Sequence, residues 1–113
     1  MVVVGIATLV AVMSCSIAPT VVLYKVSGTA LTVDVTYENS NGGTSQVSGV
    51  SLPWQYQFSV TGSAYHFLYV SAQNSGSSGS VTSEIYVDGK VDKSSTSSGA
   101  YVIATSSSSL GSY

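Results

Sequence analysis

Arginine is absent from this sequence of 113 residues, and its only Lys and Arg cations are three lysines. Charged residues make up 7% of the chain, and the formal net charge is -2. A surface that neutralises nucleic-acid phosphates needs clustered cations, and a bidentate phosphate or carboxylate clamp needs a guanidinium group. The composition therefore excludes a nucleic-acid partner as the basis of function.

Cysteine and histidine are almost as scarce, with one residue of each, Cys15 and His66. One cysteine cannot form an internal disulfide, so packing and sheet hydrogen bonds must hold the domain together. A zinc site needs three or four ligands. His66 is also the only conventional base for a serine nucleophile, and its aromatic and apolar neighbours are more typical of a structural histidine.

The carboxylates do not form a catalytic pair in the sequence pattern either. Asp34 and Glu38 share one face of a predicted strand, about 13 Å apart at about 3.3 Å per residue. That separation is too large for the acid–base pair of a glycosidase. The Gly-Ser stretches match no phosphate-binding glycine motif. We expect a protein that is not an enzyme and has no catalytic residues, no bound metal and no cofactor.

The first eighteen residues, MVVVGIATLVAVMSCSIA, carry no charge. As a helix they would span about 27 Å, close to the hydrocarbon thickness of about 30 Å. The segment is predicted to be a membrane anchor or a signal segment, and the third alternative is a buried strand. Val12 and Ser14 place Cys15 in a setting that resembles a bacterial lipobox, so Cys15 is either acylated after cleavage or inert within a transmembrane helix.

From Thr20 onward, apolar residues recur with a period of two, which indicates β-strands. The strands are predicted at residues 20–26, 31–38, 44–48, 55–61, 65–72, 81–87, 90–94 and 100–104, with the 44–48 strand weak. Leu31 is assigned to the apolar face of the second strand. The pattern predicts an all-β, antiparallel, immunoglobulin-like β-sandwich of about seven strands over residues 19–106. A flexible tail is expected over residues 107–113.

Two local features sharpen this prediction. Asp88-Gly89 is a hairpin turn signal that places Val87 opposite Lys90 and Glu84 opposite Lys93. Pro53 suits the start of a strand, and by alternation Trp54 falls on the same face as Tyr56. We therefore expect Trp54 to be a mostly buried packing residue rather than an exposed recognition residue.

The chain is rich in tyrosine, with eight residues. Tyrosine suits strands, where its ring packs and its hydroxyl stays wet, and most of these residues are expected to do so. Tyr65, Phe67 and Tyr69 alternate along one strand and share one face. This aromatic stripe is the candidate interaction surface.

A series of landmarks resembles the small mycobacterial membrane protein family, MmpS. The landmarks are Tyr24 and Gly28 in Tyr-x-Val-x-Gly, Tyr37 in Val-Thr-Tyr, Leu52-Pro53-Trp54, and Asp88-Gly89 in Ile-x-Val-Asp-Gly. The resemblance covers roughly residues 20–105. It implies a membrane-tethered extracytoplasmic β-sandwich in the cell envelope. It also implies an accessory role beside an MmpL transporter of the RND type, with a lipid or siderophore as cargo.

Two features depart from that family. Its members typically carry one cysteine just before the Ile-x-Val-Asp-Gly strand and another in the last strand, whereas this chain has Ser83-Glu84-Ile85 and Ala104-Thr105-Ser106 there. The family's disulfide is therefore missing. The family's anchors are usually uncleaved helices, whereas Cys15 has its lipobox-like setting. The competing interpretation is a surface lipoprotein or adhesion module that binds a glycan or a protein.

Overall fold

A computed structural model describes residues 19–62 and 65–111. Cys15 and the predicted membrane or signal segment lie outside these residues. The described residues form eight strands and no helix. The strands are β1 (Thr20–Ser27), β2 (Thr32–Glu38), β3 (Thr44–Ser51), β4 (Trp54–Val60), β5 (His66–Asn74), β6 (Ser80–Val87), β7 (Lys90–Ser98) and β8 (Ile103–Leu110).

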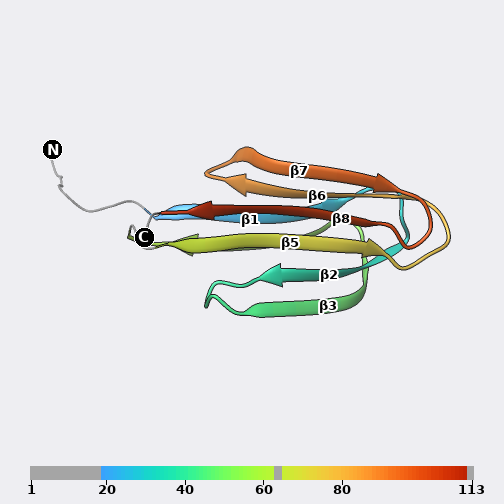
Figure 1. The fold of residues 1–113 in the computed structure, drawn as a ribbon, viewed down its shortest axis with the longest axis horizontal. Helices are drawn as coiled ribbons and strands as arrows, with labels where there is room; N and C mark the ends of the chain where they lie inside the picture. Colours follow the sequence, from blue (N-terminus) through green and yellow to red (C-terminus); the bar gives the residue numbers. More distant parts are fainter. Residues whose placement is uncertain (1–18, 63–64, 112–113) are drawn as a thin grey trace, which may run out of the picture.

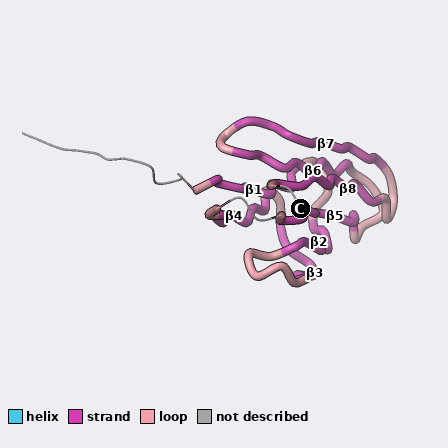
Figure 2. The backbone as a smooth tube through the Cα atoms, turned by 60° about the vertical axis from the view of Figure 1, so that its left-hand side comes forward, coloured by secondary structure: helices cyan, strands magenta, loops and turns pink. Residues whose placement is uncertain are grey.

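The strands form two four-stranded sheets, ordered β4-β1-β6-β7 and β3-β2-β5-β8. Every neighbouring pair is antiparallel, and the sheets pack face to face as a sandwich (Figures 1 and 2). The predicted all-β sandwich is confirmed. Figure 1 shows that β1 begins and β8 ends at the same end of the sandwich. We name it the entry end, and the opposite end, where β1 leads into β2, the far end.

Alternation along the strands separates the core from the two outer faces. Val22, Tyr24 and Val26 of β1 are fully buried, whereas the residues between them are partly exposed. The same alternation buries Val33 and Val35 of β2, as predicted. Leu31 was expected on this face but is 87% exposed, because β2 begins only at Thr32 and the residues before it project from the far end.

The Asp88-Gly89 hairpin forms as predicted, but its register continues as predicted only as far as the pair of Tyr86 and Val91. Asp88 and Gly89 have φ angles of 51° and 82°, the left-handed conformations that a type I′ turn requires. Val87 lies opposite Lys90, as expected, but a register shift after Tyr86 places Glu84 opposite Ser94. The predicted Glu84–Lys93 pair is therefore wrong, since Asp92 is an extra residue on β7 and forms a β-bulge.

The serine-rich segments are strands where a loop and a tail were expected. β7 continues to Ser98, and β8 runs from Ile103 to Leu110, so the predicted loop from residue 95 and the flexible tail from residue 107 are both wrong within the described residues. Serine has little preference for strands, but tertiary contacts decide here. Ser106 is 4% exposed, and the Ser97 hydroxyl donates to the Ile103 carbonyl at 2.8 Å.

Trp54 opens β4 directly after Pro53, at the corner where the chain passes from one sheet to the other. The Leu52–Pro53 peptide bond is cis. As alternation predicted, Trp54 lies on the same inward face as Tyr56 and Phe58, with exposed glutamines between them. Trp54 is half-buried rather than mostly buried, and it packs against the edge of the core.

Candidate functional site

His66 and the carboxylates do not converge on a catalytic site. The His66 ring lies 5.5 Å from the Phe58 ring, and its Nε2 is buried with no hydrogen-bond partner among the residues that the structure describes. No group of three possible metal ligands gathers in residues 19–62 and 65–111. No pocket is found in this part of the chain, so the candidate surfaces are open faces, edges and ends.

The carboxylates instead stabilise local backbone geometry or pair with hydroxyl groups. Asp34 accepts a hydrogen bond from the Gly49 amide at 2.9 Å, beside the bulge between β2 and β3. Asp88 accepts one from the Val21 amide at 2.9 Å and so ties the hairpin to β1. The remaining carboxylates accept hydrogen bonds from side-chain hydroxyls of Thr44, Tyr86 and Ser108. Each of the five acids therefore has a partner that accounts for it structurally.

The interior of the sandwich contains an aromatic cluster that spans both sheets. Its members are Tyr24, Tyr37, Trp54, Tyr56 and Phe58, with ring centroids between 4.6 and 6.2 Å apart. Such offset and edge-to-face contacts add to the free energy gained by burying the rings. Three landmark residues, Tyr24, Tyr37 and Trp54, thus serve packing.

The Tyr24 hydroxyl is the polar centre of this cluster. It donates to the Glu38 carbonyl at 2.8 Å and accepts from the Tyr69 amide at 3.3 Å. Tyr24 itself is fully buried, and burial is the main cause that raises its pKa from 10.0 to about 12. Tyr24 therefore joins β1 of one sheet to β2 and β5 of the other.

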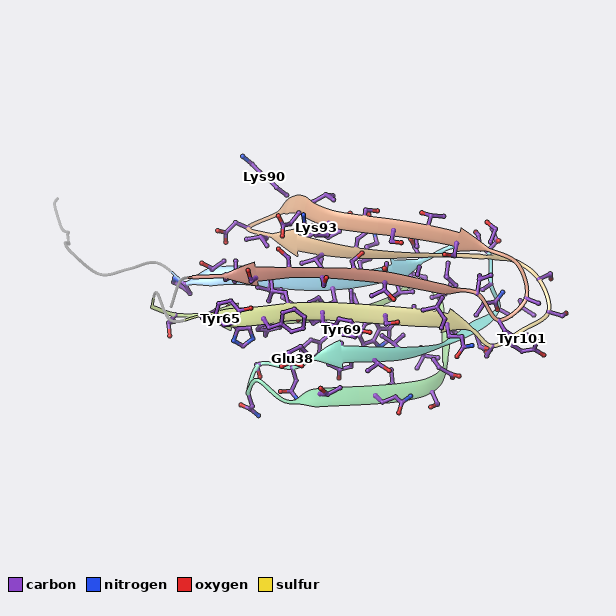
Figure 3. The ribbon with its side chains drawn as sticks, in the orientation of Figure 1. Glu38, Tyr65, Tyr69, Lys90, Lys93 and Tyr101 are labelled. Carbon is purple, nitrogen blue, oxygen red and sulfur yellow. The ribbon has the colours of Figure 1, made fainter. Side chains whose placement is uncertain are left out.

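The aromatic stripe lies on the outer face of β5, as alternation predicted. Phe67 is 42% exposed and Tyr65 is 41% exposed, and Figure 3 shows Tyr65 and Tyr69 following one another along β5. The Phe67 and Tyr69 rings stack at 6.1 Å and 24°. The two rings are nearly parallel and follow one another along the strand, so the stripe is a narrow apolar ridge.

Exposed apolar side chains gather at the two ends of the sandwich. The large exposed residues are Leu31, Tyr65, Phe67, Val91, Tyr101 and Ile103. Tyr65, Phe67 and Val91 belong to the entry end, and the other three belong to the far end. Sequence reasoning singled out only the stripe, because the exposure of Tyr101 and Ile103 follows from the actual end of β7 and start of β8.

Side-chain hydrogen bonds connect the loops of the far end, although these loops are rich in glycine and serine. Asn74 is fully buried, and its side-chain amide donates to the Ser78 and Gly99 carbonyls at 2.8 and 2.9 Å. Tyr101 has a left-handed φ of 56°, which is uncommon for a bulky residue. Its carbonyl accepts a hydrogen bond from Gln73 at 3.1 Å. The loop therefore presents an ordered tyrosine, 60% exposed, at this end.

Comparison of the sequence with models of known protein families identifies the family of this chain. The family model described as "Mycobacterium membrane protein" matches residues 5–109, which run from within the apolar segment into the last strand. The chain belongs to this family. The MmpS resemblance drawn from the landmarks is therefore confirmed. No curated protein matches the chain.

The remaining MmpS landmarks lie where the backbone adopts an unusual conformation or turns sharply. Gly28 has a φ of 136°, and a Cβ there would overlap the Ser80 carbonyl oxygen and lie 2.8 Å from its carbon. Only glycine is compatible with that approach. Asp88 and Gly89 form the hairpin turn, and Leu52 and Pro53 form the corner before Trp54. In this MmpS chain these landmark residues therefore occupy positions that shape the backbone of the fold.

The two neighbourhoods that lack the family's cysteines meet inside the sandwich. Ser83 and Ser106 are buried, and their hydroxyl oxygens lie 3.0 Å apart. Ser106 also donates to the Ser83 carbonyl at 2.9 Å. A hydrogen-bonded serine pair thus joins β6 to β8 at this position of the MmpS fold.

The stretch of the chain that the structure describes contains no helix long and apolar enough to span a membrane. The apolar residues 1–18, on which the anchor prediction rests, are outside it. Membrane association of this chain therefore rests on its family.

Proposed function

We propose that this protein is a membrane-tethered, non-enzymatic accessory subunit of an MmpL-like transporter of the RND type in the cell envelope. In this role the sandwich lies on the extracytoplasmic side and assists the export of a lipid or a siderophore. The observation that carries the proposal is the family match, which includes most of the uncharged N-terminal segment as well as the sandwich.

The shape and surface of the domain support an accessory role. The carboxylates and the buried serine pair make hydrogen bonds that stabilise the fold, and the exposed apolar residues lie at the two ends of the sandwich. A protein that must hold a partner while remaining tethered needs one end for the tether and another for the partner. The entry end follows the apolar segment directly, so the far end, with Tyr101, is the proposed partner-binding end.

Co-purification with a site-specific photo-crosslinker tests the proposal. The probe replaces Tyr101 at the far end, and a control probe replaces Gln57, which is exposed on β4 and pairs with Leu23 nearer the entry end. We expect Tyr101 probes to capture one large polytopic transport protein from native membranes, and Gln57 probes to capture much less of it. Failure of both the tagged full chain and the Tyr101 probe to retain any transporter would contradict the proposed function.

A further inference from the structure

The entry end carries its apolar side chains on both outer faces of the sandwich at nearly the same height. Ser83 pairs with Val26 on β1, Ser106 pairs with Val70 on β5, and the hydrogen bond between the two serines places these pairs level. β1 and β5 both run from the entry end toward the far end (Figure 1). Three residues earlier on each strand, Leu23 is therefore level with Phe67.

The same registers fix the heights of the other two residues. Val91 lies opposite Tyr86, and Tyr86 lies opposite Leu23, so Val91 is level with Phe67 on the other outer face. Tyr65, two residues before Phe67, is level with Val21. We measure height along the strands, from Thr20 toward the far end. At about 3.3 Å per residue, Tyr65 is about 3 Å above Thr20, and Phe67 and Val91 are about 10 Å above it.

The chain connects to this end without a linker. Only Pro19 separates the uncharged residues 1–18 from Thr20, the first residue of β1. If the apolar segment is held in the bilayer, Thr20 lies at the boundary between hydrocarbon and headgroups. The headgroup layer is about 5–8 Å thick on each side, half the difference between the total and hydrocarbon thicknesses of a bilayer.

We infer that Tyr65, Phe67 and Val91 form a collar that holds the sandwich upright on its tether, with Tyr65 in the headgroup layer of the bilayer and Phe67 and Val91 at the surface where this layer meets water. This inference rests on the membrane tether of the proposed function. Tyrosine and other amphipathic aromatic side chains favour this layer because their rings are apolar and their polar groups stay hydrated. Tyr69 lies two residues further along β5 than Phe67, and Glu38 of β2 is level with Tyr69 because Tyr37 pairs with Val70. A carboxylate at this height favours water rather than lipid above the collar.

The collar contacts lipid rather than a protein partner, because the apolar segment joins β1 directly at the entry end. A protein partner at this end would have to displace the headgroups that surround a directly attached tether. The Asn39–Gly43 turn at this end, which closes on itself through the 2.7 Å bond from the Asn39 amide to the Gly43 carbonyl, carries no charge. The hairpin at the same end carries Asp88, whose carboxylate accepts a hydrogen bond from the Val21 amide at 2.9 Å, and the cation of Lys90 follows it.

Fluorescence quenching with the full chain in vesicles tests the collar. Phe67→Trp and Ile103→Trp add a tryptophan on the same outer face of the same sheet, because Ile103 pairs with Gln73 and Gln73 is six residues after Phe67 on β5. The two positions are about 20 Å apart and similarly exposed, at 42% and 53%. The native Trp54, which pairs with Val26, gives the same background in both proteins.

The vesicles are phosphatidylcholine with a nitroxide attached to the headgroup. The emission added at position 67 is expected to be mostly quenched and the emission added at position 103 unquenched, and Val91→Trp is expected to follow position 67. Tyr65→Trp provides a second probe should Phe67→Trp fold poorly. Equal quenching at positions 67 and 103, or no quenching at 67 and 65 in chain that sediments with the vesicles, would overturn the collar while leaving the tether intact. Chain that remains in the supernatant would overturn the tether itself.

Discussion

Ser83 of β6 and Ser106 of β8 face each other across the interior of the sandwich with their hydroxyl oxygens 3.0 Å apart. Both residues are buried, and each belongs to a different sheet. This pair connects the two sheets on the serine-rich side of the sandwich, where β7 and β8 contribute few large apolar side chains. It occupies the place at which the family resemblance implies a pair of cysteines.

Replacing both serines by cysteine should give a disulfide between the sheets. Ser83→Cys with Ser106→Cys would close a loop of about 23 residues, which restricts the unfolded chain and adds about 3 kcal/mol to the free energy of unfolding. Denaturant unfolding with and without a reductant measures the difference. Ser83→Cys alone is the control and should show no dependence on the reductant. Free thiols at both position 83 and position 106 in oxidised, folded protein would show that these strands are not opposed.

Removing the Tyr24 hydroxyl should cost more than removing that of a neighbouring tyrosine. Tyr24→Phe leaves the Glu38 carbonyl and the Tyr69 amide without this partner in a buried position, which costs about 1–3 kcal/mol. The control is Tyr56→Phe, whose hydroxyl accepts only a long 3.4 Å bond from the exposed Ser40 amide. Chemical denaturation of both variants provides the comparison, and equal losses would mean that Tyr24 does not join the sheets through its hydroxyl.

The same tyrosine predicts a loss of stability in alkaline solution. Its pKa is raised from 10.0 to about 12 in the folded protein, so the unfolded chain releases this proton more easily than the folded chain does. The contribution is fully present below pH 10, and it is lost as the pH rises from about 10 to about 12. Unfolding free energies measured across this range should fall more steeply in the wild type than in Tyr24→Phe. Parallel curves would show that Tyr24 titrates normally.

Gly28 should be far less replaceable than a glycine in an open turn. In Gly28→Ala the new Cβ overlaps the Ser80 backbone at a φ of 136°, and we expect a loss of more than about 2 kcal/mol or a failure to fold. Gly42→Ala is the matched control, since nothing lies within 4 Å of its Cβ, and only the left-handed conformation, at about 1 kcal/mol, opposes it. Thermal unfolding of the two variants separates them, and similar losses would mean that the contact at Gly28 relaxes.

Substitutions of Trp54 test whether this family landmark serves packing. Trp54→Ala removes a half-buried ring that lies 5.2 Å from Tyr37, and we expect a loss of about 3 kcal/mol, the lower end of the range for large aromatic side chains. Trp54→Phe keeps most of the contact and should cost much less. Equilibrium denaturation measures both. A loss below about 1 kcal/mol for Trp54→Ala would assign the tryptophan to surface recognition.

The alternation in β1, β2 and β4 made the core predictable, because period-two patterning assigns each residue to one face. Asp88-Gly89 was predictable because few residues adopt its conformation. The bulge at Asp92 was not, since one extra residue leaves no mark in a strand of mixed polarity. The serines of β8 appeared to be a tail because their strand conformation comes from pairing with β5 and from the Ser83 contact, which are tertiary effects.

The candidate site was predictable only in part. Alternation placed Tyr65, Phe67 and Tyr69 on one face, and the structure retains them there. Nothing in the local sequence distinguished Tyr101 from the tyrosines that pack. Its exposure depends on the left-handed turn after β7 and on the support of the buried Asn74, which is the last residue of β5.

Export by cells that lack this protein tests the central claim most directly. Deletion of the gene, with and without complementation by the full chain, should be followed by measuring lipid and siderophore outside the cells. We predict that export of one of these cargo classes falls and that the full chain restores it. Unchanged export of both classes, together with the absence of any co-purifying transporter, would contradict the accessory role.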